Sequence, residues 1–325
     1  MIFSEDSRVK IPCILHLVRL GYSYLSLKEA SWDEETNIFP DVFRSSIAKI
    51  NPAMDIGDID RLLADVKLSL ENEDLGQAFY DKLVDRSGVR LIDFENFNNN
   101  SFHVVTELTC KNGDEEFRPD ITLLINGMPL AFIEVKKPNN PEGVLAERNR
   151  IVIRSKNLRF RRFINMTQLM VFSNNMEYDD GSPEPIQGAF YASSSYNAPV
   201  FNYFREEEKL DLSKLLAPED DAIENEVLRD NNLTVIKHSP EFISNKSPHT
   251  PTNRLCTSLF NRERLAFLLR FGLVYVNESD GLQKHVMRYP QLFATKAIEC
   301  KLNEGVRKGI IWHTQGSGKT ALAYY

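Results

Sequence analysis

The segment from 118 to 140, RPDITLLINGMPLAFIEVKKPNN, constrains the fold more than any other part of this chain. Its apolar stretches at 120–125 and 130–137 are each predicted to form a strand. The residues between them contain Asn126-Gly127, the strongest short sequence signal for a β-hairpin. The segment therefore predicts two antiparallel strands joined by a tight turn.

Three charged residues stand out in this apolar hairpin. A loop of three residues at 126–128 would place Asp120 directly opposite Glu134, with both side chains on one face of the sheet. Because residues i and i+2 of a strand share a face, Lys136 points the same way as Glu134. Opposed carboxylates repel each other, and charges in an apolar strand are costly unless they have a use.

A bound Mg²⁺ ion would remove this repulsion, because Mg²⁺ binds carboxylate oxygens together with water and substrate phosphate. Such an ion can activate water for attack on a phosphodiester, and Lys136 could orient that water or offset negative charge. The competing interpretation is that Glu134 and Lys136 form only a solvated ion pair. The Pro-Asp lead-in and the apolar hairpin favour the functional interpretation.

Pro119-Asp120 followed by Glu134-Val135-Lys136 resembles the motif of the PD-(D/E)xK nuclease superfamily. The wider stretch is similar to the R subunits of type I restriction enzymes. This resemblance implies that Asp120 and Glu134 bind the metal, with the carbonyl of Val135 as a further ligand, and that Lys136 is the catalytic lysine. It also implies an acidic residue on an early helix, for which Glu5 or Asp6 is the candidate. The Gln-x-x-x-Tyr motif of R subunits is not found after Lys136.

A second motif lies near the end of the sequence, at 313–320, where the residues read HTQGSGKT. It fits the P-loop pattern except that His313 replaces the first glycine. In a P-loop the glycines let backbone N–H groups approach the phosphates, while lysine contacts the β- and γ-phosphates and threonine binds Mg²⁺. The predicted ATP-binding residues here are Gly316, Ser317, Gly318, Lys319 and Thr320.

The P-loop with its preceding residues, IWHTQGSGKT, resembles the first motor motif of superfamily 2 helicases. Upstream, 286–291 is similar to the segment before that motif, which implies that Gln291 contacts the nucleotide base. The alternative for Gln291 is an ordinary exposed side chain at the start of a helix. We expect the chain to hold only the beginning of a motor lobe, truncated after the P-loop, and therefore do not expect it to hydrolyse ATP.

A basic stretch at 148–162 contains seven arginine and lysine residues, although the whole chain carries a net charge of -7. Such a concentration indicates contact with the DNA backbone beside the cleavage site. The alternatives are a solvated helix face, or pairing with nearby acids such as Glu147. The residues concerned are Arg148, Arg150, Arg154, Lys156, Arg159, Arg161 and Arg162.

Composition narrows the class of protein. Hydrophobic residues make up 42% and charged residues 26%, as in ordinary globular proteins. The four cysteines are far apart, so neither a zinc site nor a disulfide framework is predicted. The N-terminal sequence does not resemble a signal peptide, and no apolar run approaches the roughly 18 residues that span a bilayer. We expect a bacterial cytoplasmic protein with reduced thiols and no membrane contact.

Hydrophobic periodicity and turn residues predict the remaining elements. We expect an α/β fold: a PD-(D/E)xK restriction-endonuclease-like mixed sheet flanked by helices, followed by the start of a P-loop motor domain. The expected domains are a nuclease domain at 1–235, a linker at 236–260 and the beginning of motor lobe 1 at 261–325. Helices are expected at 10–20, 57–75, 142–150, 261–275 and 289–303, and further strands at 88–95, 102–110, 168–173 and 309–312.

The combined motifs predict cleavage of double-stranded DNA, coupled in a full-length protein to ATP-dependent translocation. By resemblance, the partners are the methylation and specificity subunits of a restriction-modification complex, and the cofactors are Mg²⁺ and ATP. Two alternatives stay open. One is a nuclease-like module that binds DNA or other subunits without efficient cleavage. The other is an accessory domain of a helicase-like ATPase that acts alone.

Overall fold

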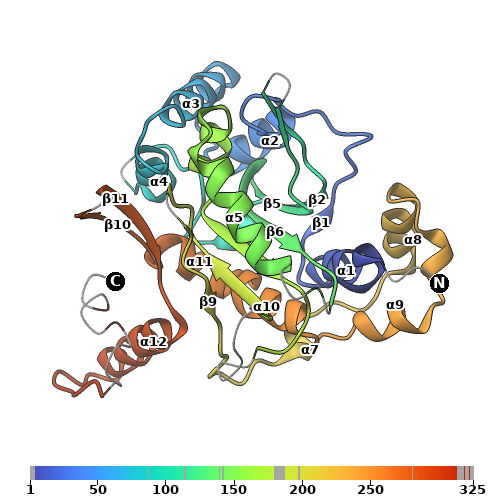
Figure 1. Cartoon of the computed structure of the whole chain (residues 1–325). Coiled ribbons are helices and arrows are strands. Elements are labelled where there is room, and N and C mark those ends of the chain that lie inside the picture. The colour runs from blue at the N-terminus through green and yellow to red at the C-terminus, as the bar shows by residue number, and fades with distance from the viewer. Residues whose placement is uncertain are drawn as a thin grey trace.

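A mixed sheet of seven strands, in the order β1-β2-β5-β6-β7-β8-β9, forms the centre of the protein (Figure 1). A computed structural model describes residues 4–86, 88–112, 115–138, 140, 143–178, 187–196, 198–279, 281–312, 318 and 322. The strands of this sheet are β1 (Ser23–Tyr24), β2 (Phe102–Thr106), β5 (Ile121–Ile125), β6 (Met128–Val135), β7 (Leu169–Ser173), β8 (Ala189–Ala192) and β9 (Asn202–Tyr203).

Strand directions in the sheet follow from its connections. β5 and β6 are antiparallel and joined by the tight turn, whereas β6 and β7 are parallel. A parallel pair needs a crossover between its strands, and helices α5 (Gly143–Lys156) and α6 (Arg161–Met166) provide it. Two small antiparallel hairpins lie outside the sheet: β3 (Cys110–Asn112) with β4 (Glu115–Phe117), and β10 (Leu273–Glu278) with β11 (Gly281–Val286).

Helices cover both faces of the sheet. Successive side chains of β6 point alternately to one face and to the other. Ile133 and Val135 belong to the larger core, which includes buried residues of α1 (Ile11–Arg19) and α10 (Pro251–Phe260). Phe132 points to the opposite face and packs in a second core with Val144 and Ile151 of α5. Glu134 and Lys136 have the same parity as Phe132, so they lie on the side of α5, which crosses in front of the sheet in Figure 1.

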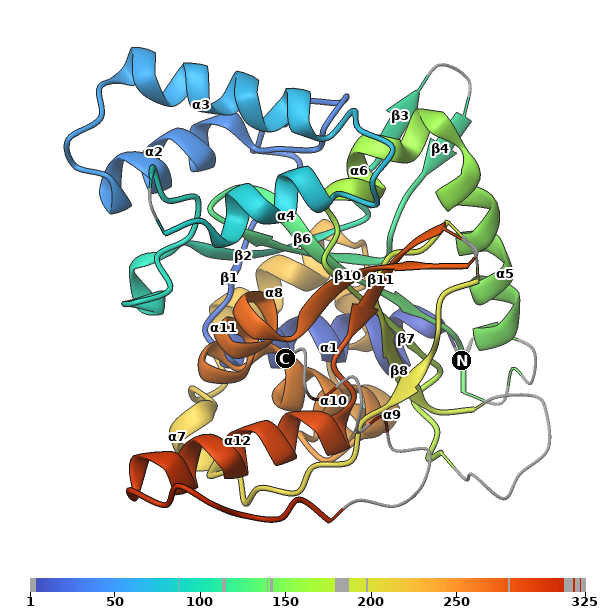
Figure 2. The ribbon, with the colours of Figure 1, turned by 90° about the vertical axis from the view of Figure 1, so that its left-hand side faces the viewer.

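Figure 2 shows α2 (Pro40–Ile50), α3 (Ile56–Ser69) and α4 (Gln77–Val84) grouped at one end of the molecule, α5 at one side and α12 (Tyr289–Asn303) at the opposite end from α3. The π-helix η1 (Asp6–Lys10) runs directly into α1, and short 3-10 helices interrupt the chain at η2 (Phe97–Asn99), η3 (Leu158–Phe160) and η4 (Thr234–Ile236). The other helices are α1 (Ile11–Arg19), α2 (Pro40–Ile50), α3 (Ile56–Ser69), α4 (Gln77–Val84), α7 (Leu212–Leu215), α8 (Asp221–Asp230), α9 (Pro240–Asn245), α10 (Pro251–Phe260), α11 (Arg262–Phe271) and α12 (Tyr289–Asn303).

The α/β fold class with helices around a mixed sheet is confirmed, and so are most of the predicted elements. The helices expected at 10–20, 57–75, 142–150, 261–275 and 289–303 correspond to α1, α3, α5, α11 and α12. The strand expected at 168–173 is β7. The strand expected at 102–110 ends at Thr106, and β3 begins separately at Cys110.

The strand predicted at 88–95 is wrong. The N–H groups of Arg90 and Asp93 donate to the side-chain oxygens of Asn51 and Asn100, at 3.0 and 2.9 Å, rather than to a neighbouring strand. The Asp93 carboxylate in turn accepts the N–H groups of Glu95 and Asn96, which closes a turn. Asparagine and aspartate side chains therefore take the place of a sheet partner.

The strand predicted at 309–312 is also wrong. Ile310 and Trp312 are each 91% exposed, and these residues have no regular secondary structure. A strand of four residues is stable only when it pairs with another strand. No strand within the described ranges lies alongside it.

The division into domains at 236–260 stays a prediction. This range contains α9 and α10, and Leu255, Cys256, Leu259 and Phe260 of α10 are buried in the larger core together with residues of α1 and β6. Where the structure describes the chain, no helix is both long and apolar enough to cross a membrane.

Candidate active site

The turn between β5 and β6 fixes the register on which the site depends. Asn126 and Gly127 have φ values of 51° and 77°, as a two-residue hairpin turn of type I′ requires. The first pairs, Ile125 with Met128 and Leu124 with Pro129, follow from this turn. A β-bulge then leaves Leu130 unpaired, so that the next pair is Leu123 with Ala131. The predicted register is therefore reached through a shorter turn and a bulge instead of a three-residue loop.

Asp120, Glu134 and Lys136 meet where β5 begins and β6 ends. The Lys136 ammonium lies 3.9 Å from Asp120 Oδ2 and 3.7 Å from Glu134 Oε2. The backbone N–H of Val135 donates to Asp120 Oδ2 at 2.8 Å, which holds that carboxylate against the end of β6. The structure thus brings together the three residues that the motif singled out.

Two hydrogen bonds fix Lys136 itself. Its backbone N–H donates to the carbonyl of Ser173 at 2.8 Å, which ties the residue after β6 to the end of β7. Its ammonium donates to the carbonyl of Val135 at 2.8 Å. The carbonyl expected as a metal ligand therefore has a lysine donor in this structure.

A fourth residue, Glu147 of α5, also lies at the site, whereas the sequence analysis names it only as a partner for the arginines of the basic stretch. It is 1% exposed, and its carboxylate lies 3.4 Å from the Lys136 ammonium. Arg150 and Arg154 donate to the same carboxylate at 3.0 and 2.8 Å. A signal existed: Glu147 stands at helical spacing between Val144 and Ile151, which are both buried.

Burial and neighbouring charges shift the pKa values of Glu134 and Lys136. Burial, followed by the neighbouring carboxylates of Asp120 and Glu147, raises the pKa of Glu134 well above its usual range. Burial alone would lower the pKa of Lys136, but Glu147, Asp120, Glu134 and Glu5 together raise it. Burial and the neighbouring carboxylates therefore favour the neutral form of Glu134, whereas the same carboxylates keep Lys136 charged.

The residues present suit a hard divalent cation. Glu134 Oε1 is buried and has no hydrogen-bond partner in the described part of the chain. Within those residues, no group of three or more His, Cys, Asp or Glu side chains is arranged to hold a metal ion. Asp120 and Glu134 would therefore be two carboxylate ligands in a shell completed by water, carbonyl or phosphate oxygens, as Mg²⁺ prefers.

Glu5 and Asp6, the acidic residues predicted to complete the site, have different neighbours. Glu5 lies close enough to Lys136 and Asp120 to interact electrostatically with both, and its pKa is raised mainly by burial. Asp6 instead forms an ion pair of 3.4 Å with the buried Lys10. Of the two candidates named from the sequence, the structure therefore places Glu5 at the site.

The backbone of Asp120 is hydrogen-bonded to Glu107, which has an unusual backbone conformation. Glu107 adopts a positive φ of 52°, and its N–H donates to the carbonyl of Asp120 at 3.2 Å. The Glu107 carboxylate pairs with Lys10 and, at 3.5 Å, with Arg118. An unusual backbone conformation is thus held in place beside a site residue.

The basic stretch does not form one continuous surface. Arg154 extends toward the site, where it also lies 3.6 Å from Glu134 and stacks over the ring of Phe117 at 4.1 Å. Arg150 and Arg154 both pair with Glu147, which is the pairing considered above as an alternative to DNA contact. Arg148 lies over the ring of Phe201 at 5.7 Å.

The second half of the stretch faces the region around α3. Arg162 donates to Glu35 and Glu71 at 2.7 Å each, and Arg161 lies 3.5 Å from Glu73. Lys156 and Arg159 are exposed. The contact of the stretch with DNA stays a prediction.

Of the predicted ATP-binding residues, the structure describes Gln291 and Gly318. Gln291 is 4% exposed, accepts the N–H of Arg288 at 2.8 Å and donates to the carbonyl of Gly318 at 3.1 Å. It therefore caps the start of α12 and contacts the predicted loop. Gly316, Ser317, Lys319 and Thr320 lie outside the described residues.

The sequence of this chain is similar to those of several known proteins. Residues 2–182 match the family described as the N terminus of the type I restriction enzyme R protein. A type I restriction enzyme endonuclease subunit named MjaIXP, from Methanocaldococcus jannaschii, is 24% identical over 98% of this chain and 30% of its own length. The HindI endonuclease subunit of Haemophilus influenzae is 23% identical over 99% of this chain and 30% of its own length. The chain thus spans under a third of these relatives.

Proposed function

Because the chain belongs to the family of type I restriction enzyme R protein N termini, we propose that it is the DNA-cleaving part of an R subunit. The proposed reaction is the Mg²⁺-dependent hydrolysis of phosphodiester bonds in double-stranded DNA. One observation carries the proposal: the Lys136 ammonium lies within 4 Å of both the Asp120 and the Glu134 carboxylates, and Glu134 keeps one buried oxygen without a hydrogen-bond partner among the described residues.

Each residue has a proposed role. Asp120 and Glu134 would hold the cation, and the Val135 N–H keeps the Asp120 carboxylate in place. When bound, Mg²⁺ would activate water and stabilise charge on the phosphodiester. Lys136, held charged by the surrounding carboxylates, would offset the negative charge that develops on the phosphate. Glu147 orients Lys136 and Arg154 from the α5 side.

The activity of the whole protein is part of the proposal. We propose that ATP-driven translocation by a motor beginning near Gln291 and the 316–320 loop is coupled to cleavage. The proposed partners are double-stranded DNA and the methylation and specificity subunits of a restriction-modification complex, in the cytoplasm. The names of the relatives, endonuclease subunits of type I restriction enzymes, support the place of the chain in an R subunit.

Nicking of supercoiled plasmid by the chain in Mg²⁺ or Mn²⁺ tests the nuclease proposal. Lys136→Ala should reduce nicking by about a hundredfold or more, the effect typical of losing one group that stabilises transition-state charge. Lys137→Ala is the matched control, because Lys137 is the next residue and is exposed. Equal nicking by Lys136→Ala and the unchanged protein would contradict the proposal.

One observation favours a second candidate, a module that binds DNA or other subunits without efficient cleavage. The carbonyl of Val135, an expected metal ligand, accepts a hydrogen bond from Lys136. Calorimetric titration with Mn²⁺ separates the two functions. A nuclease should bind the ion in the unchanged chain and lose that binding in Glu134→Gln, whereas a module should bind DNA equally well in both and show no metal binding.

A further inference from the structure

A cavity of about 350 Å³ lies beside the carboxyl end of β7, the same sheet edge that carries the candidate active site. Ser173, the last residue of β7, accepts the backbone N–H of Lys136, and the chain reaches the cavity wall three residues later at Met176. The other walls come from β9, the segment after it, and α10. The cavity therefore lies at the same end of β7 as Lys136, with its α10 wall on the other face of the sheet.

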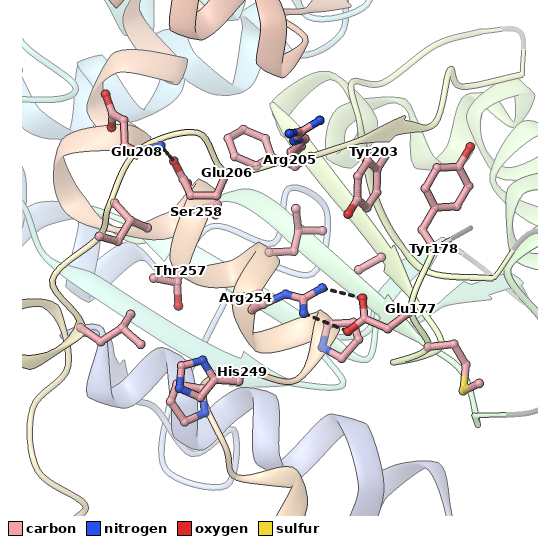
Figure 3. A pocket seen from close by; sticks show the side chains of 18 residues that line it. Glu177, Tyr178, Tyr203, Arg205, Glu206, Glu208, His249, Arg254, Thr257 and Ser258 are labelled. Atoms are coloured by element: carbon pink, nitrogen blue, oxygen red, sulfur yellow. Dashed lines mark hydrogen bonds and ion pairs between the residues drawn. The ribbon is translucent and has the colours of Figure 1, made fainter. Parts of the chain in front are cut away.

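Two tyrosines form an aromatic wall of the cavity. The rings of Tyr178 and Tyr203 lie side by side, with centroids 4.7 Å apart and planes inclined by 38° (Figure 3). Phe190 packs edge-on against Tyr178 at 5.2 Å. Tyr178 is still 36% exposed, so part of its surface is available to a ligand. A pair of rings fixed in this way offers a stacking surface at little entropic cost.

Within the ranges that the structure describes, the carboxylates of the cavity wall are all paired with cations, whereas one arginine of the wall is not. Glu177 is held by Arg254 in a two-point ion pair of 2.8 and 2.7 Å. Glu206 and Glu208 are held by the buried Arg264, and Glu208 also by Lys296. Arg205 and His249 are exposed on the cavity wall, and no carboxylate of the described residues forms an ion pair with either.

An aromatic wall with nearby cations suits one chemical class. Unpaired nucleotides bind by stacking of the base on aromatic rings and by contact of the phosphate with basic side chains. The volume is at the lower end of the range of small-ligand sites, which suits one nucleotide better than a larger ligand. We propose that this cavity holds one unpaired nucleotide of a DNA strand, its base stacked on Tyr178 and Tyr203 and its phosphate beside Arg205. The proposal rests on the proposed function for its choice of DNA as the ligand.

The test is a binding measurement on the full chain, with a short single-stranded oligonucleotide that carries 2-aminopurine. Stacking on the tyrosines should quench the fluorescence of the probe. Tyr178→Leu and Tyr203→Leu should each relieve the quenching and weaken binding by about fivefold or more, the lower end of what one base–aromatic stack contributes. Tyr178→Phe keeps an aromatic ring and should bind as the unchanged chain does. Phe271→Leu is the control, because Phe271 is 40% exposed but lies on α11, away from the cavity wall.

A second variant tests the phosphate contact. Arg205→Ala should reduce the slope of log affinity against log salt by about 0.7, the value for one phosphate contact to a single strand. Arg229→Ala, on the exposed surface of α8, should leave the slope unchanged. Equal slopes for Arg205→Ala and the unchanged chain would contradict the phosphate assignment.

Two further ligands test whether the cavity binds an unpaired strand, and not duplex DNA or a free nucleotide. A fully paired duplex with the probe at its centre should show no quenching by the chain, and free deoxyadenosine monophosphate should compete weakly. If deoxyadenosine monophosphate competes as strongly as the oligonucleotide, the ligand of the cavity is not a DNA strand and the proposal fails. Unchanged quenching in both Tyr178→Leu and Tyr203→Leu, or an equal loss of quenching in Phe271→Leu, would show that the probe does not bind in this cavity.

These outcomes are independent of cleavage. Quenching of the probe is measured without Mg²⁺ or Mn²⁺, so it reports binding alone, and no described residue of the cavity wall belongs to the candidate active site. A chain that quenches the probe but never nicks plasmid would contradict the nuclease proposal alone. A chain that nicks plasmid but quenches equally in all variants would contradict only the nucleotide site.

Discussion

The backbone N–H of Val135 donates a 2.8 Å hydrogen bond to the Asp120 carboxylate, and this bond connects the start of β5 to the end of β6. It holds one carboxylate of the candidate site in place without using a charged partner. The aspartate thus has a structural role, as an acceptor, that can be separated from its proposed role as a metal ligand.

The pair of variants Asp120→Asn and Asp120→Ala separates these roles. Asparagine keeps a side-chain acceptor for the Val135 N–H but loses the charge, whereas alanine loses both. We expect both variants to lose plasmid nicking. In urea unfolding, the asparagine variant should stay within about 0.5 kcal/mol of the unchanged chain, and the alanine variant should lose about 1–3 kcal/mol because a partly buried N–H loses its partner. Retained nicking in Asp120→Asn would contradict a ligand role for the charge.

Glu147 gives the second prediction, because it is a buried carboxylate shared by Lys136, Arg150 and Arg154. Glu147→Ala leaves these cations without their shared partner and should lower the free energy of unfolding by about 3–5 kcal/mol. Glu147→Gln keeps the shape and some hydrogen bonds, so its loss should be smaller. Glu299→Gln, at an exposed position on α12, is the control and should change little. A loss in Glu147→Ala no larger than that of the control would show that Glu147 does not support the site.

The hairpin shows how far the sequence predicts the site. The apolar strands and Asn126-Gly127 predicted the hairpin, but a regular two-residue turn alone would have paired Asp120 with Ile133. The bulge at Leu130 shifts the register by one residue, so that Ile121 pairs with Ile133 and Asp120 meets Glu134. The bulge at Leu130 was not predictable, since it depends on how the turn packs. A Cβ on Gly127 would lie 2.7 Å from the carbonyl oxygen of Phe39 and from the N–H nitrogen of Phe43, so the turn is enclosed by the start of α2.

Elements that depend on tertiary contacts were the ones missed. The segment at 88–95 has the composition of a strand, but the side chains of Asn51, distant in sequence, and of the nearby Asn100 take its hydrogen bonds. Glu147 was considered only as a partner for arginines, because its contact with Lys136 depends on how α5 packs against β6. Local patterns therefore located the motif, whereas packing determined which further charges surround it.

Lys284 provides a prediction about pH. This residue of β11 is 4% exposed, and its ammonium donates to Gln168 Oε1 and to the carbonyl of Thr167 at 2.8 and 3.1 Å. Burial lowers the pKa of Lys284 to about 7, whereas its usual value is 10.5. The unfolded chain therefore binds more protons than the folded chain between these two values, and folding stability should rise with pH in that range.

The variant Lys284→Met isolates this contribution. The slope from Lys284 is up to about 1.4 kcal/mol per pH unit between about pH 7 and about pH 10. Urea unfolding of both proteins at about pH 6 and about pH 9 should show the variant gaining relative stability at the lower pH, where the unchanged chain buries a charge. A stability difference that does not depend on pH would contradict a lowered pKa.

The final prediction concerns the basic stretch, whose members have different surroundings. Lys156 and Arg159 are exposed, whereas Arg162 is held by Glu35 and Glu71. If the stretch contacts the DNA backbone, Lys156→Ala and Arg159→Ala should each reduce the slope of log affinity against log salt by about 0.9. Binding to unrelated duplexes should weaken equally, since phosphate contacts carry no base information.

Arg162→Ala should behave in the opposite way. Its two ion pairs at 2.7 Å join the basic stretch to Glu35 and Glu71, and their loss should lower the free energy of unfolding by up to about 1 kcal/mol for each partly exposed pair. Its salt slope for DNA should hardly change, because the guanidinium is already neutralised by two carboxylates. Measuring unfolding and salt slope on the same three variants distinguishes a DNA-binding surface from a structural one. A normal salt slope in Lys156→Ala and Arg159→Ala would mean that the basic stretch serves the fold and that DNA reaches Lys136 by another face.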